Sequence, residues 1–303
     1  MHWFFITLGA PALWAVCNHI DKHLLEKYFK NAGVGALMIF SALIGVFVVP
    51  LIVLFHPSVL IIEPLQAILL ITESIIMLLA VLIYLHALRN DEASIIVPLF
   101  QTMPIFLFIL ARIFLKEHLT TLQIVGGSLI IIGAVAISLD IRQTLPKFKA
   151  KIFFPMIFSS FLLSVSALIF KFVALETNFW TATFWEYLGG IVLGFFFLLF
   201  IKKYRKDFVK TFQNNRSHVV ALNGLNEILN IAATMLMRFA SLLAPLAVVQ
   251  VMNGFQSVFV FVYGIALTLL FPRFSKESLI KKDLAQRIVA IIIIFVGSYM
   301  IQK

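Results

Sequence analysis

Long apolar stretches dominate the sequence, and short polar segments separate them. A helix needs roughly 20 mostly apolar residues to cross a bilayer, and this length predicts about ten membrane spans. Their approximate limits are residues 3–25, 33–55, 66–87, 93–115, 121–139, 152–172, 182–201, 218–238, 243–271 and 285–302. The pattern therefore predicts an all-α integral membrane protein. Because the segments between the spans are short, any chemistry has to take place within the helix bundle.

Composition supports this interpretation and excludes other classes. Of the 303 residues, 62% are hydrophobic and 13% are charged, and the mean hydropathy is +1.04. A soluble core of ordinary size could not bury so much apolar side chain. The first span has neither the basic segment nor the cleavage site of a secretory signal, so we expect it to remain as a helix. The single cysteine, Cys17, excludes an intramolecular disulfide and a Cys-cluster metal site.

Basic residues are distributed unevenly between the two sides of the predicted bundle. Most of the 24 Lys and Arg residues lie in the segments that join spans 1–2, 3–4, 5–6, 7–8 and 9–10. The exceptions are Arg112, Lys116, Lys171, Arg238 and Lys303. Lys and Arg are enriched in cytoplasmic loops. The bias therefore predicts cytoplasmic basic loops and both termini on the opposite side. It also favours anionic lipid headgroups over nucleic acid as partners of these residues.

Two halves of the sequence resemble each other weakly. Each half has a lysine in its first span, a proline in its fourth and a glycine in its fifth: Lys22, Pro98 and Gly133, then Lys171, Pro245 and Gly297. The interval from lysine to proline is 76 residues in the first half and 74 in the second. Five spans per half is an odd number, so the second half has to cross the membrane in the opposite sense. This predicts two inverted five-helix repeats, residues 1–145 and 150–303.

The segment from Tyr84 to Ile137 resembles the EamA domain of the drug/metabolite transporter superfamily. The matching features are the "AS" that opens the fourth span, the region of Pro98 and Pro104, the turn "KEHLT" in place of a Gly-Glu-basic-Leu-Thr turn, and a glycine-bearing fifth span. "LW" followed by Lys22 is similar to the family's first span, and Lys171 is similar to its counterpart in the sixth. The resemblance extends over the chain as two copies, the second without the glutamate turn.

This resemblance implies a ten-helix transporter with a central cavity between the two copies. Such a protein would move a small metabolite by alternating access. Many members of the superfamily place both termini in the cytoplasm, whereas the charge distribution of this chain predicts the reverse. We follow the charge distribution, because a pseudo-symmetric bundle can adopt either orientation.

One face of the eighth span is polar. Asn223, Asn226, Glu227 and Asn230 stand at positions i, i+3, i+4 and i+7 and therefore share a helix face. Lipid cannot satisfy these groups, so they are expected to line a substrate path. The alternative is that the asparagines hydrogen-bond between neighbouring helices.

Polar positions also mark the fourth and ninth spans. Gln250, Asn253 and Ser257 form a second stripe, and Gln101 lies between two prolines. Because proline frees a carbonyl upstream, these segments are expected to expose backbone to the cavity. Ordinary kinks that shape the bundle are the alternative.

Two glutamates at membrane depth are candidates for proton coupling. Glu73 in the third span matches Glu227 in the eighth by repeat position. Burial favours the protonated form of a carboxylate, so such a pair could load and release protons. A salt bridge from Glu73 to Lys22 or Lys171 is the alternative, and both interpretations are compatible.

The first and seventh spans supply the remaining candidates for substrate binding. In the first span they are Asn18 and Lys22, which is expected to point inward. His19 and His23 have the spacing of a zinc pair, but they lack further ligands in the sequence, and we expect neither metal nor cofactor. In the seventh span Trp185, Glu186 and Tyr187 are interfacial residues or, alternatively, candidates for the cavity wall.

No phosphate-binding loop, nucleophile elbow or HExxH motif occurs in the sequence. We therefore expect a secondary transporter of a small polar metabolite, amino-acid-like or nucleoside-like, in a bacterial inner membrane. Buried lysines would suit a carboxylate, and Glu227 would suit an amine. The alternatives are a flippase for lipid-linked intermediates and, from another class, a membrane-embedded enzyme that uses Glu73 and Glu227 as an acid/base pair. The oligomeric state is not predicted.

Overall fold

The structure, a computed structural model, describes residues 2–27, 34–90, 96–138, 150–270 and 281–302. Helices make up nearly all of these residues, and no strand occurs among them. The elements are α1 (His2–Lys27), α2 (Val34–Leu43), α3 (Gly45–Phe55), η1 (Pro57–Leu60), α4 (Pro64–Asn90), η2 (Val97–Thr102), α6 (Met103–Phe114), α7 (Thr121–Ser138), α8 (Ala150–Glu176), α9 (Phe179–Phe200), α10 (Lys202–Leu243), α11 (Leu246–Val251), α12 (Gly254–Leu270) and α13 (Lys281–Ile301).

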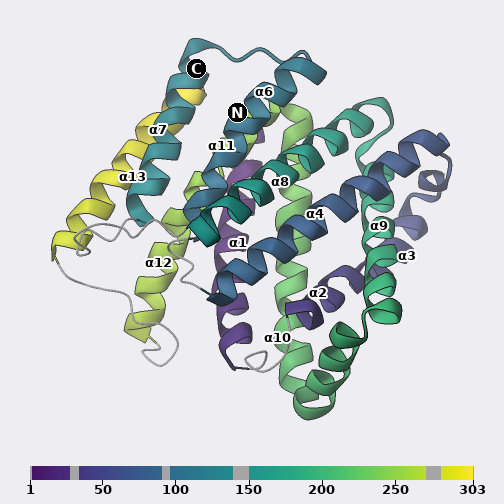
Figure 1. The fold of residues 1–303 in the computed structure, drawn as a ribbon. Coiled ribbons are helices and arrows are strands. Elements are labelled where there is room, and N and C mark those ends of the chain that lie inside the picture. Colours follow the sequence, from purple (N-terminus) through teal and green to yellow (C-terminus); the bar gives the residue numbers. More distant parts are fainter. Residues whose placement is uncertain (1, 28–33, 91–95, 139–149, 271–280, 303) are drawn as a thin grey trace.

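The membrane spans expected from the sequence are present. Among the described residues, seven helical segments are long and apolar enough to cross a membrane. Shorter apolar helices at Leu99–Phe114, Thr121–Ala136 and Ala285–Ile301 account for the other three predicted spans. Both chain ends lie at the same end of the bundle, and the junction of α9 and α10 lies at the opposite end (Figure 1). The prediction of an all-α membrane protein is confirmed.

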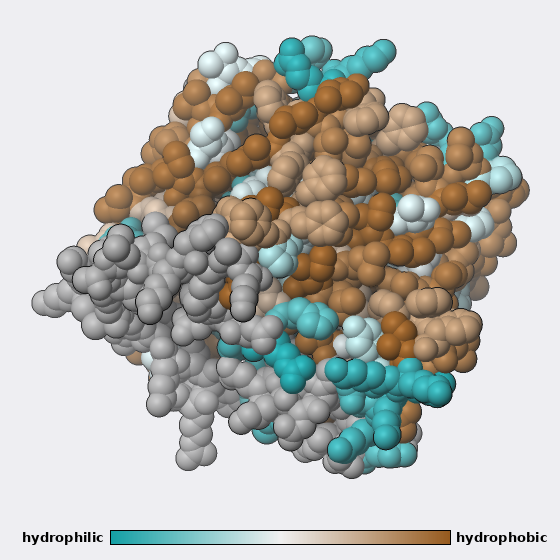
Figure 2. All heavy atoms as spheres, in the orientation of Figure 1, coloured by the Kyte–Doolittle hydropathy of each residue, from teal (hydrophilic) through white to brown (hydrophobic). Residues whose placement is uncertain are grey.

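The surface supports a membrane setting. Apolar side chains cover the broad middle of the face shown in Figure 2, whereas hydrophilic side chains gather at its upper edge and near the start of α10. Large apolar residues stand out from the bundle, among them Phe5, Phe47, Phe55 and Leu270, each at least 70% exposed. An apolar surface this extensive is stable against lipid chains and unstable against water.

Helix pairing follows a regular scheme. The most extensive contacts join α1 to α10, α4 to α8 and α7 to α13, and α2 also packs on α9. In span numbers these pairs are 1 with 8, 3 with 6, 5 with 10 and 2 with 7. The predicted repeat makes span 1 the counterpart of span 6, 2 of 7, 3 of 8 and 5 of 10. When every span is replaced by its counterpart, the same four pairs result. The repeat boundaries at residues 145 and 150 remain a prediction.

Three spans are interrupted within their length. The second breaks at Ile44, where the amide of Phe47 donates to the Ile44 carbonyl at 3.0 Å. The fourth begins as the 3₁₀ helix η2 and continues as α6, with Pro104 in the first turn of α6. The ninth breaks between α11 and α12. A helix interruption exposes backbone groups that a polar cavity can use.

The eighth span is part of a much longer helix. α10 contains 42 residues, which corresponds to roughly 60 Å at about 1.5 Å per residue. The sequence interpretation of residues 202–217 as a loop is therefore wrong. Glycine and proline are absent from this segment, and its many Lys, Arg and Gln residues favour a helix. The basic residues belong to a helical extension of the span.

Glycines bring α7 and α13 into close contact. A Cβ added to Gly126 would lie 2.6 Å from the carbonyl oxygen of Gly297, and one added to Gly297 would lie 2.5 Å from that of Gly126. Helices in lipid associate through such small residues, which let backbones approach. The glycine pair therefore sets the distance between the two helices.

We expect Gly126→Ala and Gly297→Ala each to lower the unfolding free energy by about 1–3 kcal/mol, because each new methyl group meets backbone that cannot rotate away. Thermal unfolding of the purified protein in detergent measures the loss. Gly224→Ala is the matched control, because nothing lies within 4 Å of its added Cβ. An equal response of all three variants would contradict close packing as the cause.

Candidate functional site

A cavity of ≈ 280 Å³, lined by apolar side chains and by several polar and ionisable ones, lies inside the bundle. Its walls come from both halves of the chain, chiefly from α1, α2 and α4 on one side and from α8, α9 and α10 on the other. Six of the predicted site residues line it: Asn18, Asn226, Glu227, Asn230, Gln250 and Asn253. The cavity thus combines the polar stripe of the eighth span with polar groups of the first and ninth.

The first cluster of polar residues in the cavity consists of Asp21, Ser41, Asn226 and Glu227, here named the Asp21–Glu227 cluster. Asn226 Nδ2 donates to Asp21 Oδ1 at 2.7 Å, and Ser41 Oγ donates to Glu227 Oε1. Both hydrogen bonds join α10 to helices of the first half. Asn226 and Glu227 are 4% and 3% exposed, so neither can be solvated by bulk water in this state.

Asn230 continues this face of α10. Trp14 Nε1 donates to Asn230 Oδ1 at 2.9 Å, and both residues line the cavity. Asn18 lies nearby on α1, with Tyr84 Oη at 3.4 Å from its Oδ1. The asparagines therefore do bridge helices, as one interpretation of the sequence held, while they also face the cavity.

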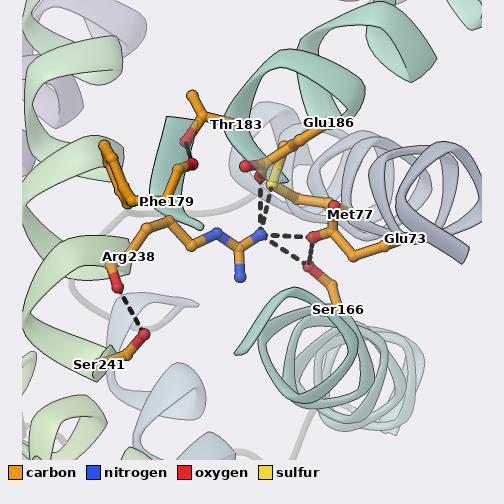
Figure 3. A network of polar contacts seen from close by, with 8 residues as sticks. All are labelled: Glu73, Met77, Ser166, Phe179, Thr183, Glu186, Arg238 and Ser241. Carbon is orange, nitrogen blue, oxygen red and sulfur yellow. Dashed lines mark hydrogen bonds and ion pairs between the residues drawn. The ribbon is translucent and has the colours of Figure 1, made fainter. Parts of the chain in front are cut away.

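The second cluster is built around Arg238 on α10 and is named the Arg238 cluster (Figure 3). Arg238 Nη2 donates to Glu73 Oε1 and, at 2.7 Å, to Glu186 Oε1. Ser166 Oγ accepts from the same nitrogen at 3.1 Å and donates to Glu73 Oε1 at 2.5 Å. The guanidinium carbon lies 4.5 Å from the ring centre of Phe170. Four helices, α4, α8, α9 and α10, meet at this one side chain.

The charges of the Arg238 cluster do not balance when both carboxylates are ionised. Glu73 is 0% and Glu186 is 2% exposed, and one guanidinium serves both. Buried charges are stable only when paired and hydrogen-bonded. The Oε2 atoms of both glutamates have no hydrogen-bond partner among the described residues. A single proton on either carboxylate would neutralise the cluster.

The two clusters lie at different depths in the bundle. Glu227 and Arg238 are eleven positions apart on α10, which is roughly 16 Å along the helix axis. Glu73 belongs to the Arg238 cluster and does not line the cavity. The structure therefore does not bring Glu73 and Glu227 together as an acid/base pair. Glu73 does form a salt bridge, but its partner is Arg238, so the sequence alternative of a salt bridge to Lys22 or Lys171 named the wrong partner.

Lys171 lies outside the cavity lining, at a contact between the two halves. Its Nζ lies 2.5 Å from Glu117 Oε1 and donates to the Ala244 carbonyl at 2.8 Å. Glu117 Oε2 accepts from the Leu246 amide at 2.7 Å, at the start of α11. The preceding residue, Lys116, has φ 54°, in the left-handed region where glycine is favoured. The "KEHLT" turn thus positions a carboxylate that joins α8 and α11.

The remaining predicted residues lie outside the lining too. Trp185 Nε1 donates to the Val59 carbonyl at 3.0 Å and so anchors η1. Gln101 and Asn223 are buried, at 2% and 0% exposure, and Lys22 is partly buried on α1. The amide atoms of Asn223 have no hydrogen-bond partner among the described residues. His19 Nε2 lies 3.3 Å from the Val260 carbonyl, in a helix contact. Pro98 lies in η2, but its side chain is outside the described residues.

Sequence reasoning missed Asp21 and gave Arg238 no site role, whereas Glu186 was a candidate for the cavity wall and does line the cavity. A signal for Asp21 was present, because Trp14, Asn18 and Asp21 stand at i, i+4 and i+7 and share one face of α1. Arg238 was recognisable as an isolated charge near the end of a span, a feature that by default marks a functional residue.

Comparison with known proteins gives three findings. The EamA-like transporter family matches residues 1–139. A curated protein of Methanocaldococcus jannaschii, described as uncharacterized, is 37% identical over 70 residues, which are 23% of this chain and 51% of that protein. The chain thus spans about half the length of this relative. A solved protein crystal structure shares the fold, with a TM-score of 0.67, 14% identity and coverage of 99% of this chain and 95% of the other.

Proposed function

We propose that this chain, whose residues 1–139 match the EamA-like transporter family, is a secondary transporter that moves a small polar metabolite across the membrane by alternating access. One observation carries the proposal: a cavity of ≈ 280 Å³, with buried polar and ionisable side chains in a largely apolar lining, lies between membrane-spanning helices of both halves. Polar and ionisable groups at this depth are costly unless they serve a substrate or ion path.

The helix pairing supports alternating access. In inverted-repeat transporters the two copies exchange their arrangements, so that the cavity opens first to one side and then to the other. The pairs of α1 with α10 and of α4 with α8 are related by that exchange in this chain. Each pair carries one polar cluster, Asp21 with Glu227 in the first and Glu73 with Ser166 in the second. Two symmetrically placed clusters suit a carrier better than an enzyme, because an enzyme needs a single arrangement of catalytic residues.

Proton coupling is the second part of the proposal, and Glu227 is its better candidate. Glu227 lines the cavity, so a proton or a substrate can reach its carboxylate. Glu73 is held by Arg238 and Ser166 behind the lining. We therefore assign the coupling role to Glu227 and a structural role to Glu73.

Labelling of intact cells with a thiol reagent tests the orientation of the protein in the membrane. Lys206 is exposed at the start of α10, at the end of the bundle opposite both termini. In a Cys17→Ser background, Lys206→Cys should resist a membrane-impermeant maleimide in intact cells and react after lysis, because basic segments face the cytoplasm. A reporter fused after Lys303 should read as non-cytoplasmic. The reverse pair of results would reverse the orientation and leave the fold unchanged.

Reconstitution tests the proposed function. Purified protein in proteoliposomes should show saturable uptake or counterflow of at least one compound in a screen of amino acids, amines and nucleosides. Uptake should respond to an imposed pH gradient. Protein-free liposomes and heat-treated protein are the controls. A screen without any saturable flux, performed on protein that is shown to be folded, would count against a transporter.

A further inference from the structure

We propose that the cavity takes a small organic cation, an amine on an apolar body, and that the Asp21–Glu227 cluster holds the ammonium group. This inference rests on the proposed function, because it names the substrate class of the same cavity. It requires three observations together: the charge of the lining, an unpaired acceptor and an apolar wall.

The lining carries more carboxylates than cations. Among the described lining residues Asp21, Glu186 and Glu227 are acidic, and Arg238 is the one Lys or Arg. Arg238 is committed to Glu73 and Glu186. Asp21 and Glu227 are therefore left with hydrogen-bond donors but without a guanidinium or ammonium group in the lining. Glu227 is buried and Asp21 is partly buried, and two carboxylates so far removed from water are costly unless protons or a bound cation compensate them.

The hydrogen-bond pattern identifies the kind of cation. An ionised carboxylate only accepts, so Asp21 requires the Nδ2 side of the Asn226 amide, as the 2.7 Å contact shows. This fixes the amide orientation and leaves Asn226 Oδ1 as an acceptor. That oxygen has no partner among the described residues, although Asn226 is only 4% exposed. Buried polar atoms without partners are rare in proteins and need an explanation.

A primary ammonium group has three donors and no acceptor. The cluster offers Asp21, Glu227 and Asn226 Oδ1 as acceptors on facing helices. A carboxylate or phosphate ligand would meet three acceptors and repulsion from two charges. A neutral hydroxyl would satisfy one of them and leave the charge uncompensated.

The rest of the cavity is apolar and aromatic. Trp14, Tyr84, Phe100 and Tyr187 line it, and the Tyr84 and Phe100 ring centres are 5.1 Å apart. Aromatic faces attract cations and pack against flat apolar bodies. The volume of ≈ 280 Å³ limits the ligand to a compact molecule. These features favour an amine with an aromatic or branched apolar substituent.

Three probes of matched size separate charge from shape: phenethylammonium, 3-phenylpropanoate and 2-phenylethanol. Calorimetric titration of the full-length protein in lipid nanodiscs should show binding of phenethylammonium at least tenfold tighter than that of the other two. Stronger binding of the carboxylate, or equal binding of all three, would overturn the proposal. This comparison uses the wild-type protein and does not depend on the folding of any variant.

Variants then locate the ammonium site. Asp21→Asn and Glu227→Gln keep the side-chain shape and should each weaken phenethylammonium binding at least tenfold. Glu176→Gln removes a carboxylate at the end of α8, where it accepts from Gln66 at 3.1 Å, and should leave binding unchanged. Equal effects of all three variants would show that net charge, and not the cluster, attracts the amine.

The flux assay keeps this inference separate from the proposed function. Saturable transport of an acidic or neutral compound, without amine binding, would uphold the transporter and reject the amine. Specific amine binding without any flux would uphold the ammonium site and reject the transporter.

Discussion

Arg238→Met should destabilise the protein by about 3–5 kcal/mol, the largest loss expected from any single substitution in this chain. Methionine fills a similar volume but removes the charge that serves both Glu73 and Glu186. Both carboxylates are almost fully buried, so water cannot replace the guanidinium. The helices that meet at Arg238 lose their shared contact as well. Thermal or denaturant unfolding in detergent measures the effect.

Two comparisons show whether charge is the cause. The triple variant Arg238→Met, Glu73→Gln, Glu186→Gln carries no net buried charge, so it should recover a large part of the lost stability. Lys171→Met breaks another buried pair but should cost less, because Glu117 is 15% exposed and keeps its hydrogen bond from the Leu246 amide. If Arg238→Met costs no more than Lys171→Met and the triple variant shows no recovery, loss of the buried positive charge is not the cause of the destabilisation.

Glu227→Gln should remove the pH dependence of transport and lower its rate by roughly 10²-fold or more where flux is driven by a proton gradient, because an amide cannot carry the proton. The glutamine keeps a hydrogen-bonding side chain beside Ser41, so the fold should remain intact. Initial rates in proteoliposomes at a series of pH values measure the effect, with unfolding curves as the check on folding.

Glu73→Gln is the matched control for this experiment. It removes a buried carboxylate but leaves Arg238 paired one-to-one with Glu186 at 2.7 Å. We expect the pH profile of this variant to keep the wild-type form. A flat profile in Glu73→Gln and an unchanged profile in Glu227→Gln would transfer the coupling role to the Arg238 cluster.

The sequence was sufficient for the spans and for much of the cavity. Apolar length alone located ten spans, because the bilayer sets a minimum length that few other structures imitate. The stripe of Asn226, Glu227 and Asn230 was predictable for a similar reason, since helical spacing fixes which residues share a face. Asn223 shows the limit of this argument: it belongs to the same stripe, yet it lies buried outside the lining.

What the sequence could not supply is the rotation of one helix against another. Lys22 and Asp21 are neighbours on α1, and a difference of one position decides which of them faces the cavity. Contact with α10 settles that choice, and the spacing of Trp14, Asn18 and Asp21 shows only which residues share a face, not which way that face points. The partner of a charged residue is also decided by helix packing and not by local sequence. Lys171 pairs with Glu117 of the "KEHLT" turn, which is 54 positions away in the chain.

The length and continuity of α10 have a mechanical consequence. Glu227 and Arg238 lie on one helix that runs from Lys202 to Leu243 without a proline, so the axis between them has no point of easy bending. A tilt of α10 that moves Glu227 away from Ser41 therefore has to move Arg238 relative to Glu73 and Glu186. The unbroken helix therefore couples the position of Glu227 to that of Arg238, roughly 16 Å away along the axis.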